Sequence, residues 1–128
     1  MADIFANSNL IISSMINVIR HLKKTYFTPS KDIRFEIELK RLKSFFNLDS
    51  NEVSIFCLLL VEYFGYGEKP INIGILSKEF NITPLRLFEF RDEFVALEEK
   101  GFIYSDSSDN KQSLSKYYRV SENVVDAI

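Results

Sequence analysis

The stretch from residue 50 to about residue 64, SNEVSIFCLLLVEYF, constrains the fold most, because its apolar residues leave almost no polar face. Asp49 and Glu52, three residues apart at its start, resemble a capping box, which occupies otherwise unpaired amides at the beginning of a helix. A helix that is hydrophobic all round is buried. The stretch therefore predicts a helix at the centre of the core, with the other elements packed around it.

Two amphipathic segments precede this helix. The second, KDIRFEIELKRLKSFFNL, fits two periods, because residues 33–39 alternate as in a strand whereas Phe35, Leu39, Leu42 and Phe46 share one helical face. Oppositely charged pairs four residues apart favour the helix, although the pattern alone leaves a strand over residues 32–40 open. In the helix, Ile33 and Ile37 lie off the main apolar face and need a second partner.

The first amphipathic segment, residues 4–24, has apolar side chains at three- and four-residue spacing, which predicts a helix. Its apolar face is too wide to leave in water, so we expect the helix to pack on a partner surface or on the part of the chain from residue 49 onward. The centre of this face is formed by Ile12, Met15, Ile16 and Ile19, and Ile11, Val18 and Leu22 lie one step round the helix.

Shorter elements follow the central helix. The turn GYGEKP leads to a candidate short strand at residues 71–73, a short helix in GILSKEF and a tight turn at NIT. Thr83 can cap the next helix and Pro84 suits its first position, so that helix is expected to run to about Lys100, where Gly101 ends it.

The C-terminal part has the pattern of a hairpin. FIYS and YYRV flank a polar loop, which predicts antiparallel strands near residues 102–105 and 117–120. SENVVDAI then begins another helix. Together these segments predict a mainly α fold with a small β-hairpin.

The order of these elements, together with the spacing of ILSKEFNIT and VALEEKGFI, resembles a winged helix-turn-helix domain. The resemblance divides the chain into an N-terminal segment of two amphipathic helices, residues 1–48, and a winged helix-turn-helix domain, residues 49–128. In detail, SKEFNITPLRLFEFRDEFVALEEKGFIYSDSS and YYRVSENVVDAI are similar to the N-terminal winged-helix region of a group of bacterial AAA+ ATPases. The resemblance implies that a nucleotide-binding module follows this region in the full-length protein.

The chain itself lacks the ATPase machinery of that family. Its four glycines, Gly65, Gly67, Gly74 and Gly101, form no phosphate-binding loop with a following Lys and Ser or Thr. Any ATP-binding module is therefore expected downstream. The chain also ends within an apparent helix, VVDAI, as expected for a fragment of a longer protein.

Composition points away from catalysis and from membranes. Cys57 is the single cysteine and lies in an apolar run, which predicts a buried core residue and excludes a Cys-based zinc site. His21 has no second histidine or acid cluster nearby, so it is interpreted as a helix-surface or helix-end residue. We expect no catalytic, cofactor-binding or metal-binding residues and no enzyme activity. With Asp3 in place of a basic leader and a short, interrupted apolar stretch after it, the expected location is the cytoplasm.

Charge is divided unevenly along the chain. Residues 1–48 carry a net charge of +4 and the remainder −6. The outward face of the expected helix at 84–100 comprises Arg86, Glu89, Glu93 and Lys100, and this face is the candidate interaction surface. DNA affinity rests mainly on neutralising phosphates with Lys and Arg, so this acidic helix disfavours DNA reading.

Two classes of function fit these observations. We favour a non-catalytic protein-interaction or regulatory domain that docks on its own downstream domain or on another subunit, with the N-terminal helices supplying a docking surface. A winged-helix subunit of a chromosome-organising complex would act in the same way. The alternative is a DNA-binding transcription regulator that contacts DNA through Arg86, Lys111 and Lys116. Basic residues of the N-terminal segment would then touch the DNA backbone: Arg20, Lys23, Lys24, Lys40, Arg41 and Lys43.

Overall fold

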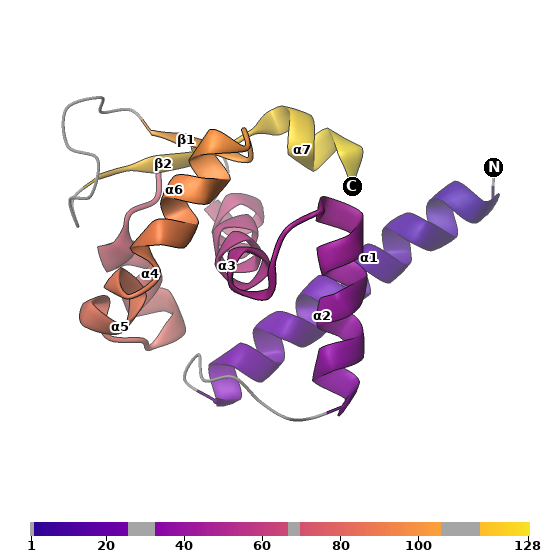
Figure 1. The fold of residues 1–128 in the computed structure, drawn as a ribbon, viewed down its shortest axis with the longest axis horizontal. Helices are drawn as coiled ribbons and strands as arrows, with labels where there is room; N and C mark the ends of the chain where they lie inside the picture. The colour runs from indigo at the N-terminus through magenta and orange to yellow at the C-terminus, as the bar shows by residue number, and fades with distance from the viewer. Residues whose placement is uncertain (1, 26–32, 67–69, 106–115) are drawn as a thin grey trace.

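The structure, a computed structural model, describes residues 2–25, 33–66, 70–105 and 116–128. Within these ranges it describes the side chains from residue 9 onward, except that of Tyr66. It is mainly α-helical with a small antiparallel hairpin, which confirms the predicted fold class (Figure 1). The elements are α1 (Ala2–Lys24), α2 (Ile33–Phe46), α3 (Ser50–Tyr66), α4 (Ile73–Phe80), α5 (Pro84–Phe88), α6 (Arg91–Glu99), β1 (Ile103–Ser105), β2 (Tyr118–Val120) and α7 (Glu122–Ala127).

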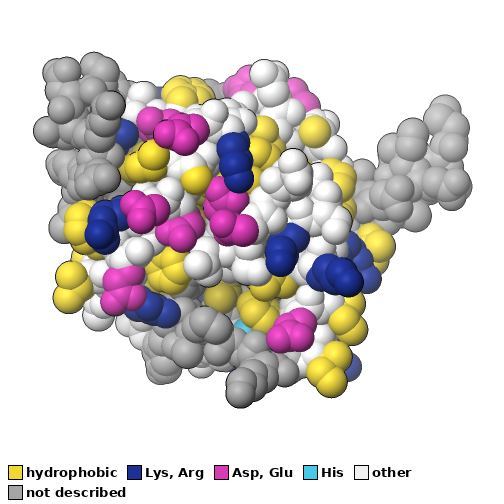
Figure 2. Space-filling view, in the orientation of Figure 1, with side chains coloured by type: hydrophobic (Ala, Val, Ile, Leu, Met, Phe, Trp, Pro, Cys, Tyr) yellow, Lys and Arg dark blue, Asp and Glu magenta, His cyan; other side chains and the backbone are white. Residues whose placement is uncertain are grey.

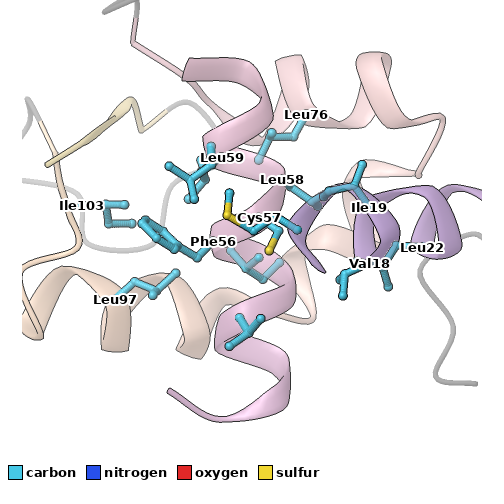
Figure 3. Packing of buried hydrophobic residues seen from close by; sticks show 14 of the residues in the cluster. Val18, Ile19, Leu22, Phe56, Cys57, Leu58, Leu59, Leu76, Leu97 and Ile103 are labelled. Atoms are coloured by element: carbon cyan, nitrogen blue, oxygen red, sulfur yellow. The ribbon is translucent and has the colours of Figure 1, made fainter. Parts of the chain in front are cut away.

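Helix α3 is the centre of the core, as its composition predicted. Figure 3 shows Phe56 of α3 beside Leu97 and Ile103, while the side chains of α1 lie on the other side of the helix. The predicted capping box is present, because the Asp49 amide donates to Glu52 Oε1 at 2.9 Å and the Glu52 amide to Asp49 Oδ1 at 2.8 Å. Residues 52–60 of α3 are buried on every side, so this part of the helix, capped at its start, is the centre on which the surrounding elements pack.

Residues 33–46 form a helix, so the helical interpretation of the second amphipathic segment is confirmed. Helix α2 packs along α1, and both contact α3. The two helices are joined by polar contacts: Arg41 Nη1 donates to Ser14 Oγ at 2.9 Å and Asn17 Nδ2 to Glu38 Oε1 at 3.0 Å. As predicted, Ile33 and Ile37 lie off the buried face and are exposed.

Helix α1 packs on the rest of the chain, but its buried face is rotated from the centre of the predicted stripe. Val18 and Leu22 are buried, whereas Ile12 and Ile16 are exposed. The reason is geometric, because α1 must face both α2 and α3, and the two directions together cover only part of its apolar surface. The remainder faces outward.

The prediction of one continuous helix over residues 84–100 is wrong. The helix is interrupted after Phe88, and α6 begins at Arg91. Around the break the amide of Phe90 donates to the Leu87 carbonyl at 3.0 Å, a shorter-range bond than in an α-helix. The Arg91 Nη1 donates to the Phe88 carbonyl at 3.3 Å and its guanidinium lies 5.1 Å from the Phe88 ring. These contacts satisfy backbone that the interruption frees.

The hairpin has the predicted position, with Tyr104 opposite Arg119 in antiparallel register. The possible third strand at 71–73 is reduced to a single bridge between Ile71 and Tyr118, because α4 already begins at Ile73. The predicted stop at Gly101 is present, since this residue has φ 83°, a conformation that glycine adopts without strain. The polar tip of the hairpin lies outside the described residues.

Within the described residues, no single helix is long and apolar enough to cross a membrane. Taken together, α2 and α3 are long and apolar enough, but they are bent by 85° relative to each other.

Candidate interaction surfaces

The outward face predicted from the sequence divides between α5 and α6. On α5, Arg86 forms an ion pair with Glu89, and its guanidinium lies 5.1 Å from the centre of the Phe90 ring. Thr83 caps this helix by accepting a hydrogen bond from the Arg86 amide at 3.2 Å. Arg86 is therefore engaged with neighbouring side chains of its own chain.

Lys100, at the end of α6, is directed toward the start of α3. Its Nζ lies 2.8 Å from Glu52 Oε1 and 2.9 Å from Oε2. Burial of Glu52 raises the pKa of its carboxyl, but the Asp49 amide and the Lys100 ammonium outweigh this effect and leave the pKa below its usual value. The pair ties α6 to the capping box of α3.

Lys116, one of the residues predicted to contact DNA in the alternative function, is buried. Its Nζ lies 3.4 Å from Glu98 Oε1 and 5.5 Å from the centre of the Tyr118 ring. Burial, with a further contribution from Glu98, raises the pKa of Tyr118 to about 12. Lys116 thus stabilises the junction of hairpin and α6, and Lys111 lies outside the described residues.

The remaining charges of this face are mostly acidic. Glu93 is half-buried, and neither it nor the exposed Asp92 forms an ion pair with any residue that the structure describes. Figure 2 shows acidic side chains interspersed with basic ones over the part of the molecule where α5 and α6 lie. The predicted face therefore contains Arg86, Glu89 and Glu93, while Lys100 is held by Glu52.

A second surface is an apolar groove between α1, the end of α3 and α7, with a volume of about 740 Å³. Its walls include Ile12 and Ile16 of α1, 44% and 51% exposed, and Phe64 of α3, which is 63% exposed. Val125 of α7 and Ile128, the residue that follows this helix, also line the groove. These side chains could bury apolar surface on another molecule.

The charged residues that line this groove are both basic, Arg20 and Lys23. Arg20 is exposed and forms no ion pair with any described residue. The Lys23 Nζ lies 5.2 Å from the centre of the Phe80 ring. Lys23 also acts on Glu62: burial and the charge of Glu79 raise the pKa of the Glu62 carboxyl, and the Lys23 charge opposes that rise. The groove is thus apolar along its length and positive at one end.

The sequence indicated only part of this groove. The apolar face predicted for the N-terminal helix contains Ile12 and Ile16, whereas the prediction for Arg20 is a contact with the DNA backbone in the alternative function. The contributions of Phe64 and Val125 were missed, because hydrophobic spacing identifies a face within one helix but not which separate faces are brought together. The sequence signal for the groove was Phe64 itself, an apolar residue at the end of α3 that the core does not bury.

The described residues hold no group of three or more His, Cys, Asp or Glu side chains that could bind a metal ion. Cys57 is buried as predicted, and burial raises the pKa of its thiol to about 12. His21 lies in the last turn of α1, where its ring stacks on Phe35 with the centroids 4.2 Å apart.

Comparison with protein-family models, with curated proteins and with solved structures found no match for this chain.

Proposed function

We propose that this chain is a non-catalytic protein-interaction domain, in which residues 49–128 form a winged helix-turn-helix that does not read DNA. The observation that carries the proposal is the pairing of basic side chains with carboxylates of the same chain. Arg86 pairs with Glu89, Lys100 with Glu52, and Lys116 with Glu98.

Such pairing weakens the main source of DNA affinity. A protein gains that affinity when its Lys and Arg neutralise phosphates and release bound counterions. A basic group that must first leave a carboxylate gains less, and the carboxylate left behind would then repel the phosphate. Meanwhile the groove on α1 offers exposed apolar surface of the kind that marks sites of protein association.

The resemblance to the N-terminal region of bacterial AAA+ ATPases supplies the second part of the proposal. In it, the chain is the interaction module of a larger cytoplasmic ATPase and docks on that protein's own downstream domain or on another subunit. The ATP-binding residues would belong to the downstream module.

A titration with random-sequence duplex DNA at low salt tests the proposal. We expect wild-type affinity of about 100 μM or weaker. Replacing an acid on the predicted face, in Glu89→Lys or Glu93→Lys, should increase affinity, because each change adds a cation and removes a repulsive charge. Fluorescence anisotropy of the labelled duplex measures both effects.

The matched control is Arg86→Ala, which removes the basic side chain of α5. Micromolar wild-type affinity that falls steeply with added salt and weakens in Arg86→Ala would overturn the proposal. That outcome would favour the DNA-binding transcription regulator instead.

A further inference from the structure

We propose that the groove between α1, α3 and α7 binds an amphipathic helix of a partner protein that carries acidic side chains at the end beside Arg20 and Lys23. The inference rests on the proposed interaction function and specifies the chemistry of the partner. It is built from the shape of the groove, the exposure of its walls and the sign of its charges.

The shape fits a helix. The α1 side of the groove extends from Ile12 to Lys23, which at a rise of about 1.5 Å per residue is roughly 16 Å, or three helical turns. A partner helix of that length presents anchors at positions i, i+3, i+4 and i+7 along one face. The described part of the groove is lined by helical residues and by the C-terminal Ile128, so it offers no strand edge to an extended peptide.

The exposure of the walls argues for a partner larger than the groove. Sites for small ligands enclose about 70–90% of the ligand surface. Here Ile16 and Phe64 remain more than half exposed, so a single acyl chain would leave them and itself partly in water. A helix that belongs to a folded partner covers such side chains from the outside.

The charges decide between partners. Arg20 and Lys23 lie near one another on α1, and no acidic side chain lines the described groove. Glu62 and Glu79 lie near Lys23, so Arg20 is the group with the more available charge. A second copy of this chain, docking groove to groove by two-fold symmetry, offers no acidic side chain from the described groove to pair with these basic groups. An acidic partner supplies that pair and fixes the direction in which its helix lies.

Two labelled synthetic peptides test the inference against the full chain by fluorescence anisotropy. Both are amphipathic helices with leucine at positions i, i+3, i+4 and i+7, and they differ only in having glutamates or lysines at one end. We expect the wild-type chain to bind the acidic peptide about tenfold more tightly than the basic one. Arg20→Glu should reverse this order, because it reverses the sign of the charge at the end of the groove.

Phe64→Ala should weaken binding of the acidic peptide about tenfold by removing an apolar wall. Lys24→Glu is the matched charge control, since Lys24 is exposed on α1 outside the groove, and it should change affinity less than about twofold. Ile33→Ala is the matched apolar control on α2. Circular dichroism and thermal melts verify that each variant is folded.

Several outcomes would overturn the inference. These are equal binding of both peptides, no binding of either at about 1 mM, and a loss in Lys24→Glu as large as in Arg20→Glu. Sedimentation equilibrium showing a dimer that Phe64→Ala dissociates would assign the groove to a second copy. Displacement of the acidic peptide by oleate alone would assign it to a fatty acid. None of these measurements involves DNA, so a negative result would overturn this inference without deciding the proposed function, which the DNA titration tests separately.

Discussion

The predicted face on α5 and α6, here the α5–α6 face, and the groove between α1, α3 and α7 differ in how their basic side chains are paired. On the first and at its borders, Arg86, Lys100 and Lys116 are each paired with a carboxylate of the same chain. In the groove, Arg20 has no such pair among the described residues and stands beside exposed apolar side chains. A basic side chain that is paired within its own chain has little to offer an anionic partner, whereas a basic side chain without such a pair, beside apolar surface, can select one.

The two regions also differ in what they do for the fold. The Lys100–Glu52 pair joins the end of α6 to the start of α3 and therefore helps to hold the structure together. The groove side chains Ile12, Ile16 and Phe64 lie outside the core, so they can change with little effect on folding. Substitutions can separate these two roles.

The largest expected effect contrasts two phenylalanines of the same helix, Phe56 and Phe64. Phe56 is fully buried beneath α6 and β1, so Phe56→Ala should lower the free energy of unfolding by about 3–5 kcal/mol. Phe64→Ala should change it by less than about 0.5 kcal/mol. Urea denaturation followed by circular dichroism measures both. A similar loss in the two variants would show that Phe64 belongs to the core and not to a free groove wall.

The next effect concerns Glu52, which caps α3 and binds Lys100. Glu52→Ala removes both contacts and should cost about 1–2 kcal/mol. Glu52→Gln keeps the capping geometry and removes only the charge, so it should cost less, particularly because the Lys100 side chain is 44% exposed and partly screened by water. Equal losses in the two variants would show that the ion pair, and not the cap, accounts for the effect.

Acid should abolish the difference between wild type and Glu52→Gln. The pKa of Glu52 is lowered in the folded state, so the ionised carboxyl contributes stability above its ordinary value of 4.5. That contribution is lost as pH falls through the folded-state pKa. Urea midpoints measured from pH 7 to pH 3 should therefore converge at the acidic end.

Glu62, at the groove end of the same helix, should respond in the opposite sense. Its pKa is raised by burial and by Glu79, so ionisation above pH 4.5 destabilises the folded state. Glu62→Gln should raise the melting temperature at pH 7, by less than Glu52→Ala lowers it, because Lys23 already offsets part of the penalty. The gain should vanish below pH 4.5. A lower melting temperature for Glu62→Gln at pH 7 would mean that the Lys23 charge dominates at this site.

The central helix and hairpin could be predicted from the sequence because their signals are local. Burial of α3 follows from a nearly continuous apolar run, and its start follows from Asp49 and Glu52. The end of α6 follows from Gly101, which adopts a positive φ. Each of these signals depends on residues close together in the chain.

The break between α5 and α6 and the composition of the groove could not be predicted in this way. No glycine or proline marks the break, which is instead stabilised by Arg86 above Phe90 and Arg91 above Phe88. The pairing of Lys100 with Glu52 joins residues far apart in sequence. Such contacts are set by tertiary packing, so local periodicity carries no record of them.

The smallest expected effect lies on the α5–α6 face, in the ion pair between Arg86 and Glu89. Both side chains are partly exposed, so a double-mutant cycle with Arg86→Ala and Glu89→Ala should give a coupling energy of about 0.3–0.5 kcal/mol. Urea denaturation of the four proteins provides the measurement, and 1 M salt should reduce the coupling because exposed charges are screened.

The value of this coupling sets how firmly Glu89 holds Arg86 against other anions. If the coupling is present, Arg86 must give up Glu89 to reach a phosphate, and the phosphate then meets the released carboxylate of Glu89. A coupling indistinguishable from zero would remove this obstacle at Arg86. The contrast between the two surfaces would then rest on Lys100 and Lys116, whose carboxylate partners are on other elements.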